Sequence, residues 1–388
     1  MIRCDSDPTL SIRWTNFLFP TNASASATVP CPPPPPCALR PYSTMGNVIA
    51  ALAPQSSLSV DLWPPPPTFD LTRDIPDLSG YVALVTGGNS GIGYYVVQHL
   101  ARKGAKVYLA GRNSAKTHEA VARLKADGEV VFLEVDLADL RSVKRAADEF
   151  LAMERRLDIL VNNGCVLRAL SLCTLAHYGI IPSGVMNPPT TLLTAQNLDA
   201  AFGTNIASHH LLTTLLLPAL KASHAATGKP ARVLSTASST HTRPSGVSFT
   251  SLIGGKERDE WLAEQWGMLL GFQLYAQSKL IGVVITNHWA KTHAAFLVAS
   301  SVHPGSINTD LKRHFPSAFQ LLWQLALNPP LRGAYPLLWA AAIASPSEIT
   351  AEYIVPPARK GVPNPLTRDA AFERQVVSFV DDVIQDYL

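Results

Sequence analysis

The chain has 388 residues and a mass of 41.8 kDa, enough for one large domain or two modest ones around a substantial core. Hydrophobic residues make up 47% and charged residues only 16%, a composition that excludes disorder throughout the chain. The 32 Lys and Arg residues barely outnumber the 29 Asp and Glu residues. The net charge of +3 is too small to indicate a nucleic-acid partner.

The sequence predicts a cytoplasmic protein with no transmembrane segment. It contains no charge-free apolar run of about 18 residues, and no basic start with an apolar core that would indicate a signal peptide. The five cysteines are Cys4, Cys31, Cys37, Cys165 and Cys173. Their spacing matches no zinc site, so we predict no metal, and a disulfide-stapled secreted domain does not fit.

The N-terminal segment differs in composition from the rest of the chain. Residues 1–67 hold 14 of the 31 prolines, including Pro32–Pro36 and Pro64–Pro67. Such a segment adopts polyproline II or stays disordered, because it cannot supply a packed core. We therefore predict a disordered tail over 1–70 and a folded domain over 76–388. A ligand for a proline-binding module is the alternative role of the tail, and Met45 is an alternative start of translation.

From Tyr81 onward, short apolar runs of strand length alternate with stretches of helical period. The predicted strands are 81–86, 105–110, 130–135, 157–161, 231–236 and 296–302. Helices are predicted between them, most clearly over 91–104 and 140–156, and an amphipathic helix over 372–388 closes the chain. This alternation indicates right-handed βαβ crossovers. The predicted fold class is α/β, a Rossmann-type doubly wound parallel sheet in a single domain.

A glycine-rich turn follows the first predicted strand and precedes a predicted helix. Its sequence, TGGNSGIG, places Gly87, Ser90, Gly91, Ile92 and Gly93 between the two elements. Glycines allow a tight turn and let the main chain approach a pyrophosphate, which the N-terminus of the helix then stabilises. These residues are predicted to bind a dinucleotide, and a simple strand–helix connection is the alternative.

The end of the second strand predicts which dinucleotide is bound. Enzymes that bind NAD on this fold carry an acid about 20 residues after the glycine turn, where it accepts a hydrogen bond from the ribose 2′-hydroxyl. Arg112 stands there instead. A guanidinium suits a 2′-phosphate, so NADP(H) is the predicted cofactor. A solvated surface arginine is the alternative.

The sequence YAQSK contains the most specific signal. Its Tyr275 and Lys279 are four residues apart, so on a helix they share one face. A free tyrosine has a pKa near 10 and is a poor acid or base at neutral pH. A neighbouring ammonium stabilises the phenolate and brings that pKa toward the working range. The pair is therefore a candidate for proton transfer.

The TGGNSGIG turn and the YAQSK pair, in this order, resemble the short-chain dehydrogenase/reductase superfamily. More narrowly, the chain resembles the retinol-dehydrogenase-like members found in fungi. The resemblance runs from about Pro76 to the mid-340s. It implies an oxidoreductase of the CH–OH or C=O group, with Tyr275 as acid/base, Lys279 on the cofactor ribose, and a role in secondary metabolism.

The resemblance also supplies the other catalytic residues. Ser238, in ARVLSTASSTH, matches the serine that holds the substrate oxygen, and Ser239 is the competing assignment because the segment offers two registers. Asn205, in FGTNIASHHLL, matches the helix asparagine that holds a water in a proton relay to the lysine. An ordinary buried asparagine is its alternative.

Four further residues match the family's cofactor contacts. Asp136 matches the aspartate that binds the adenine, and Asn163 matches the adenosine-side asparagine. In HPGSINT, the main chain at Ile307 and the side chain of Thr309 match contacts to the nicotinamide carboxamide and a phosphate. His303 at the start of this motif is interpreted as a structural histidine, because Tyr275 already fills the role of base.

The substrate side is predicted to be apolar. The segment between Ser238 and Tyr275 is longer than in small family members and includes Trp261, Trp266 and Phe272. After Thr309, HFPSAFQLLWQLALNPP supplies further apolar cover. We therefore expect a lipophilic ketone, aldehyde or alcohol as substrate. A peripheral membrane contact or the surface of a homo-oligomer is the alternative role of the second stretch.

The pattern breaks after the fourth strand. The family writes N-N-A-G-V-M, whereas this chain writes Asn162-Asn163-Gly164-Cys165 and resumes only at Gly184. Residues 164–183 are thus a predicted insertion, either an artefact of the gene model or a genuine lid. The insertion keeps a rival function open, a cofactor-binding but catalytically weak scaffold or regulator. An epimerase or dehydratase on the same fold is the third alternative.

Overall fold

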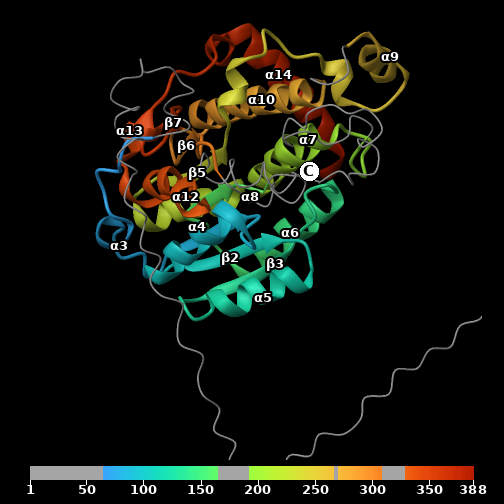
Figure 1. The fold of residues 1–388 in the computed structure, drawn as a ribbon. Coiled ribbons are helices and arrows are strands. Elements are labelled where there is room, and N and C mark those ends of the chain that lie inside the picture. The colour runs from blue at the N-terminus through green and yellow to red at the C-terminus, as the bar shows by residue number, and fades with distance from the viewer. Residues whose placement is uncertain (1–63, 165–191, 266–269, 308–327) are drawn as a thin grey trace, which may run out of the picture. The chain divides into compact units, whose positions relative to one another are not determined.

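The computed structural model describes residues 64–164, 192–265, 270–307 and 328–388 (Figure 1). The strands in this part of the chain are β1 Val82–Thr86, β2 Lys106–Gly111, β3 Val130–Glu134, β4 Ile159–Asn162, β5 Ala231–Thr236, β6 Leu297–Val302, β7 Tyr353–Val355 and β8 Arg359–Lys360. The α-helices are α3 Leu71–Asp74, α4 Gly91–Arg102, α5 Ala115–Leu124, α6 Leu140–Met153, α7 Ala200–Phe202, α8 Ser208–Thr227, α9 Lys256–Glu264, α10 Leu270–Thr292, α12 Pro330–Leu338, α13 Pro346–Ile349 and α14 Ala370–Ile384. Shorter turns of 3₁₀ or π type are η1 Gly203–Ala207, η2 Ser239–Thr242, η3 Phe249–Leu252, η6 Trp339–Ile343, η7 Pro365–Arg368 and η8 Gln385–Tyr387.

The described strands form one sheet in the order β3-β2-β1-β4-β5-β6-β7-β8. Every neighbouring pair is parallel except β7 and β8, which run antiparallel. The six predicted strands and the closing helix are confirmed, with shifts of one or two residues at most ends. The sequence analysis missed β7 and β8, whose three and two residues are too short to show a period.

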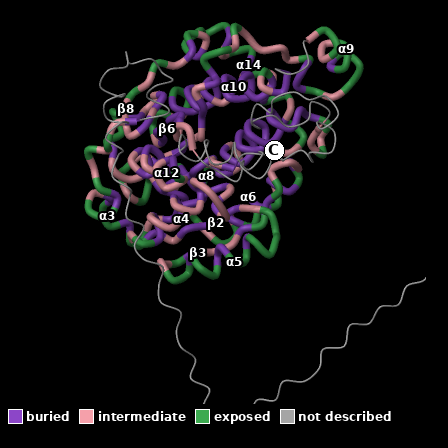
Figure 2. The backbone as a smooth tube through the Cα atoms, in the orientation of Figure 1, coloured by how far each residue is buried: buried purple, intermediate pink, exposed green. Residues whose placement is uncertain are grey.

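Helices cover both faces of the sheet, as expected for a doubly wound fold. On one face, α6, α8, α10 and α14 pack their apolar sides into one core. On the other, α4, α5 and α12 pack with the short helix α3 into a second core. Figure 2 shows the inner faces of these helices as buried. The predicted fold class is therefore confirmed.

Capping residues set the limits of several helices. Ser114, Asp139 and Asp369 precede α5, α6 and α14, and each side chain accepts a hydrogen bond from a main-chain N–H of the first turn. The long helix α8 ends at Gly228, whose φ of 68° lies in the left-handed region that favours glycine. These helices therefore begin or end at defined residues.

The folded domain begins earlier than predicted. Leu71 and Ile75 are only 3% and 1% exposed and belong to the core under α4. The ring of Phe69 lies 5.6 Å from that of Tyr335 on α12. The predicted start at residue 76 is therefore too late, because α3 lies over the sheet and brings its apolar side chains with it. The earlier part of the predicted tail, up to residue 63, lies outside the described residues.

The strand order creates a site at one edge of the sheet. From β1 the chain moves outward to β2 and β3, then returns to the other side of β1 as β4. At such a switch point the connections diverge and leave a crevice beyond the carboxyl ends of the strands. Thr86, Asn162 and Thr236 end β1, β4 and β5 at this edge. No helix in the described ranges is long and apolar enough to cross a membrane.

Candidate active site

The glycine turn between β1 and α4 has the tight geometry that its sequence predicts. Gly87 and Gly91 have φ angles of 65° and 58°, in the left-handed region that residues other than glycine rarely adopt. A Cβ at Gly88 would lie 2.8 Å from side-chain atoms of both Val97 and Leu109. The glycines therefore allow α4 to start immediately after β1 and to pack closely on β2.

Gly93 brings the first turn of α4 against the end of β4. A Cβ at Gly93 would collide with the main-chain oxygen of Gly87 and lie 2.6 Å from Nδ2 of Asn163. That Nδ2 donates to the main-chain oxygen of Thr86 at 3.1 Å, and Thr236 Oγ1 donates to Asn163 Oδ1 at 3.4 Å. The Asn163 side chain thus joins β1, β4 and β5 beneath the turn.

The N-terminus of α4 is open toward the crevice. Ser90 is the N-cap residue, and its side chain makes no capping hydrogen bond. The first N–H groups of a helix have no partner within the helix, and they carry the positive end of its dipole. Ser90, Gly91 and Ile92 are all partly exposed. The turn therefore offers a hydroxyl and main-chain N–H groups of the kind that bind phosphate.

The two residues predicted at the adenosine end are both exposed. Arg112 follows β2, and its carbonyl accepts a hydrogen bond from Thr117 Oγ1 at 2.8 Å, which fixes the main chain there. Asp136 follows β3, and its Oδ1 accepts from the N–H of Ala138 at 3.0 Å. Both side chains lie beyond the carboxyl ends of their strands, the edge at which the glycine turn also stands.

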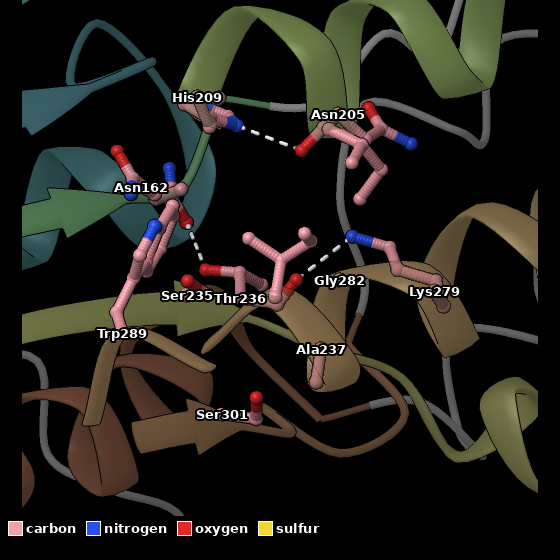
Figure 3. A pocket seen from close by; sticks show the side chains of 14 residues that line it. Asn162, Asn205, His209, Ser235, Thr236, Ala237, Lys279, Gly282, Trp289 and Ser301 are labelled. Atoms are coloured by element: carbon pink, nitrogen blue, oxygen red, sulfur yellow. Dashed lines mark hydrogen bonds between the residues drawn. The ribbon is translucent and has the colours of Figure 1, made fainter. Parts of the chain in front are cut away.

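The predicted acid/base pair lies on α10. Tyr275 and Lys279 are 7% and 5% exposed, so both are buried at this end of the sheet. The Nζ of Lys279 lies 5.6 Å from the centre of the Tyr275 ring and donates to the carbonyl of Thr236 at 2.8 Å. Figure 3 shows the ammonium directed toward the end of β5. The helix therefore holds a cation beside a phenol, as the four-residue spacing predicts.

Asn205 lies in the π-helical turn η1, directly before α8. Its side chain is buried, and neither Nδ2 nor Oδ1 has a hydrogen-bond partner in the described part of the chain. It lines a cavity of about 30 Å³ together with Lys279, Asn162 and Ser301 (Figure 3). The Asn162 Oδ1 and Ser301 Oγ atoms also lack partners among the described residues. The volume and these polar atoms suit one or two ordered waters.

Ser238 lies between β5 and the short turn η2, as the N-cap residue of that turn. It is 7% exposed, whereas Ser239 is only partly buried. Its Oγ accepts a hydrogen bond from the N–H of Thr240 at 3.3 Å. The predicted Ser238 and the competing Ser239 thus differ in burial, and the buried one lies beyond the end of β5, the strand whose last carbonyl receives Lys279.

Two buried histidines adjoin this site, and the sequence analysis assigned neither of them a role. His209 Nδ1 lies 2.9 Å from the carbonyl oxygen of Asn205, and its Nε2 lies 2.9 Å from Thr86 Oγ1. His241 Nδ1 lies 2.7 Å from the carbonyl oxygen of Ser238. Burial lowers the pKa of each imidazole to about 4, so both are neutral at pH 7. One sequence signal could have pointed to these histidines, namely that His241 lies three residues after Ser238 and His209 lies four residues after Asn205.

The remaining predicted residues are only partly described. Ile307 ends the described segment after β6, bridges to Asn328, and contacts Gly333 of α12. Thr309 and the predicted insertion from residue 165 onward lie outside the described residues. His303 is buried, and its ring stacks on Tyr353 with the centres 6.4 Å apart.

Comparison with known proteins identifies the family. Residues 81–248 match the short chain dehydrogenase family. A short-chain dehydrogenase/reductase of Armillaria gallica is 36% identical over 335 residues, which cover 85% of this chain and 98% of that protein. An uncharacterized oxidoreductase of Schizosaccharomyces pombe is 34% identical over 355 residues, covering 87% and 93%. The chain belongs to the short-chain dehydrogenase/reductase family and is an oxidoreductase.

Solved structures show the same fold. A protein from Mycobacterium paratuberculosis superposes with a TM-score of 0.58 at 24% identity, covering 82% of this chain and 97% of that one. The NADPH-bound carbonyl reductase from chicken fatty liver has a TM-score of 0.52 at 19% identity, covering 74% and 100%. A short chain dehydrogenase from Burkholderia cenocepacia, in complex with NADP, has a TM-score of 0.52 at 23% identity, covering 74% and 98%.

Proposed function

We propose that the protein is an NADP(H)-dependent oxidoreductase that interconverts a lipophilic alcohol and its ketone or aldehyde. The observation that carries the proposal is the buried pair on α10, with the Lys279 ammonium 5.6 Å from the Tyr275 ring centre. Ser238 and Asn205 complete the family's catalytic set. Ser238 follows strand β5, and Asn205 precedes helix α8. The family relationship makes oxidoreduction the expected use of such a pair.

The residues present fit a nicotinamide dinucleotide. Gly87 and Gly93 leave no room for a Cβ, so the glycine turn packs tightly against Gly164 and against its own main chain. The uncapped Ser90 and the first N–H groups of α4 would hold the phosphates. Arg112 would hold a 2′-phosphate and Asp136 the adenine. Bound there, the nicotinamide supplies or accepts the hydride of the reaction.

Asn163 contributes to cofactor binding in a different way from Arg112. Both polar atoms of its side chain are engaged with β1 and β5, so its support would come from holding the turn in shape. The main chain at Ile307 and the side chain of Thr309 complete the proposed cofactor contacts on the nicotinamide side.

Each catalytic side chain has a distinct proposed role. Tyr275 exchanges the proton with the substrate oxygen, and the positive charge of Lys279 stabilises the phenolate that is formed. With the cofactor bound, Lys279 would also contact its ribose. Ser238 donates a hydrogen bond to the same substrate oxygen, which stabilises the charge that develops on it. Asn205 holds water in the cavity beside Lys279, and this water returns the proton.

The described part of the substrate side supports a lipophilic substrate. Trp261 of α9 is partly exposed. Phe272 of α10 is also partly exposed and lies 5.8 Å below the guanidinium of Arg243. Trp266 and the apolar stretch after Thr309 lie outside the described residues. Exposed aromatic surface on the chain segment that leads to the catalytic helix suits a carbonyl compound with an apolar body.

The proposal is tested with purified protein, NADPH and a panel of lipophilic ketones and aldehydes, such as decanal and 2-decanone. Oxidation of NADPH is followed by absorbance, with NADH in parallel. The control is Tyr275→Phe, which removes one hydroxyl but keeps the ring, so the Tm and the NADPH Kd should be retained. We expect its turnover to fall roughly 10²- to 10⁴-fold.

Two results would overturn the proposal. Equal turnover by Tyr275→Phe and wild type would remove the proton donor from the mechanism. Tight NADPH binding without oxidation by any carbonyl of the panel would favour the catalytically weak scaffold instead. A matched pair, Ser238→Ala and Ser239→Ala, assigns the serine, because only the first should lower turnover.

A further inference from the structure

Two buried histidines beside the proposed active site make the same pair of contacts. In each, Nδ1 faces the main-chain carbonyl of a proposed catalytic residue, Asn205 for His209 and Ser238 for His241. In each, Nε2 faces a second element of the fold. For His209 this is Thr86 at the end of β1, and for His241 it is the N–H of Asn364, at 3.2 Å.

The partners of His241 fix its protonation. A carbonyl oxygen can only accept, so Nδ1 must carry the proton that Ser238 receives. A main-chain N–H can only donate, so Nε2 must be the unprotonated acceptor of the Asn364 N–H. The side chain of Asn364 donates to the carbonyl of His241 at 3.1 Å, which holds the two segments together. His241 is therefore neutral and protonated on Nδ1.

The partners of His209 lead to the same state by a count of lone pairs. Thr86 Oγ1 already accepts N–H groups from Asn163 at 2.9 Å and Gly164 at 2.8 Å. Two bonds use both of its lone pairs, so its own proton is left to donate. His209 Nε2, at 2.9 Å, is a much closer acceptor than the carbonyl of Val161, at 3.4 Å. His209 Nδ1 then donates to the carbonyl of Asn205. A second proton on this ring would have no acceptor at Thr86.

We propose that His209 and His241 are positioning residues of the active site, each acting as a neutral imidazole protonated on Nδ1. His209 fixes the π-turn at Asn205 to the end of β1, beside the glycine turn. His241 fixes the turn at Ser238 to the C-terminal segment at Asn364. The inference rests on the proposed function in one respect, since it takes Asn205 and Ser238 as catalytic.

The groups that face each ring favour the neutral state. Lys279 lies on the site side of His209, and its positive charge opposes a second positive charge there. His303 acts on His241 in the same sense, and the intervening Tyr353 ring lies 4.5 Å from the His241 ring. No acidic group of the described residues raises the pKa of either ring. The rings therefore keep their unprotonated Nε2 at neutral pH.

His210 provides a matched control on the same helix. It is buried like His209, but its Nε2 lies 2.7 Å from Asp381 Oδ1 of α14, and its ring stacks on Trp289 at 5.7 Å. Its contacts thus tie α8 to α14 and α10, and neither of these hydrogen-bonding or stacking partners is a proposed catalytic residue. Removing it should lower stability without misplacing one.

The test compares five variants of the full chain. His209→Leu and His241→Leu remove both contacts, and we expect kcat to fall roughly 10²-fold, the effect of misplacing a catalytic group by about 1 Å. Asparagine places an N–H where Nδ1 stood, so His209→Asn and His241→Asn should recover most of kcat while the Tm stays lowered. His210→Leu should lower the Tm and keep kcat. Unchanged kcat in the leucine variants, or no recovery with asparagine, would overturn the proposal.

A second measurement needs neither substrate nor a variant that folds. In ¹⁵N-histidine-labelled wild-type protein, the NMR signals of His209 and His241 should show the proton on Nδ1 and an unprotonated Nε2 at pH 7. A proton on Nε2 in either ring would contradict the proposal. Since this signature is independent of turnover, a protein that reduces no carbonyl but shows it would refute the proposed function and leave the histidine assignment standing.

Discussion

The glycine turn and helix α10 prepare the two ends of one site by opposite means. At the turn, the main chain supplies most of the proposed binding surface, and glycines with left-handed φ angles and close contacts with β2 and β4 leave no room for a Cβ at Gly87, Gly88 and Gly93. At α10, the proposed function rests instead on buried side chains, Tyr275 and Lys279. Substitutions in the turn should therefore cause steric overlap and weaken cofactor binding. Substitutions of the α10 side chains should instead lower turnover and leave the fold intact.

The largest effect is expected at the α10 end. Lys279→Ala removes the charge beside Tyr275 and the bond to the Thr236 carbonyl, so turnover should fall roughly 10²- to 10⁴-fold. Lys291→Ala on the same helix is the control, because Lys291 is exposed and pairs with Glu373 at the surface. Steady-state kinetics with the best carbonyl of the panel measures both. A loss in Lys291→Ala as large as in Lys279→Ala would contradict the comparison.

Acid should destabilise the fold through the two buried imidazoles that adjoin the site, His209 of α8 and His241 of η2. In the unfolded chain His209 and His241 titrate near their ordinary pKa of 6.5, whereas burial lowers the pKa of each to about 4 in the fold. Protons therefore bind the unfolded state first as the pH falls below about 6.5. Stability should be complete above that pH and fall by about 3 kcal/mol for each ring by pH 4.

Urea unfolding between pH 7.5 and pH 4 measures this loss. The variants His209→Asn and His241→Asn should each flatten the pH dependence, because the group that titrates is gone. A wild-type unfolding free energy that stays constant from pH 6.5 to pH 4 would contradict the burial of neutral imidazoles.

At the glycine turn, adding a single methyl group should be enough to lower both the stability of the fold and the affinity for NADPH. Gly93→Ala places a Cβ against the main chain of Gly87 and the Asn163 side chain, neither of which can move freely. We expect about 1–3 kcal/mol of lost stability, typical of overpacking, together with weaker NADPH binding. Gly246→Ala is the control, since nothing lies within 4 Å of a Cβ there. Calorimetric titration measures NADPH binding, and thermal unfolding measures stability. If both quantities were the same for the two variants, the turn would be loosely packed and the prediction would be wrong.

The smallest effect concerns the choice of cofactor. Arg112→Asp should weaken NADPH binding about tenfold or more, a loss of at least about 1.4 kcal/mol of binding free energy, because it removes the charge pair with the 2′-phosphate. NADH lacks this phosphate, so its binding should change little. Arg123→Asp, an exposed arginine on α5, is the control. Wild-type protein that binds NADH as tightly as NADPH would remove Arg112 from the cofactor site.

Sequence patterns predicted the parts of the molecule that local chemistry determines. The six longer strands follow from apolar runs, the turn from its glycines, and the α10 pair from a four-residue spacing. The patterns missed β7 and β8, which are too short for a period, and placed the domain start too late, because Leu71 and Ile75 stand alone after a proline-rich segment.

The support of the site could not be predicted in the same way. Thr86, His209 and His241 act through partners far away in the sequence, such as Asn364, which lies 123 residues from His241. The π-turn at Asn205 also follows from tertiary packing, since its sequence reads as the start of an ordinary helix. Such contacts become visible only when β1, α8 and the C-terminal segment are placed in space.

Hydride transfer is the central claim, and isotopic labelling tests it most directly. NADPH carrying deuterium at both C4 positions is incubated with the best ketone of the panel, and the alcohol is analysed by mass spectrometry and NMR. We predict one deuterium on the carbinol carbon with wild-type protein and roughly 10²- to 10⁴-fold slower labelling with Tyr275→Phe. Conversion of the substrate with all deuterium retained on the cofactor would contradict the account and indicate an epimerase or dehydratase on the same fold.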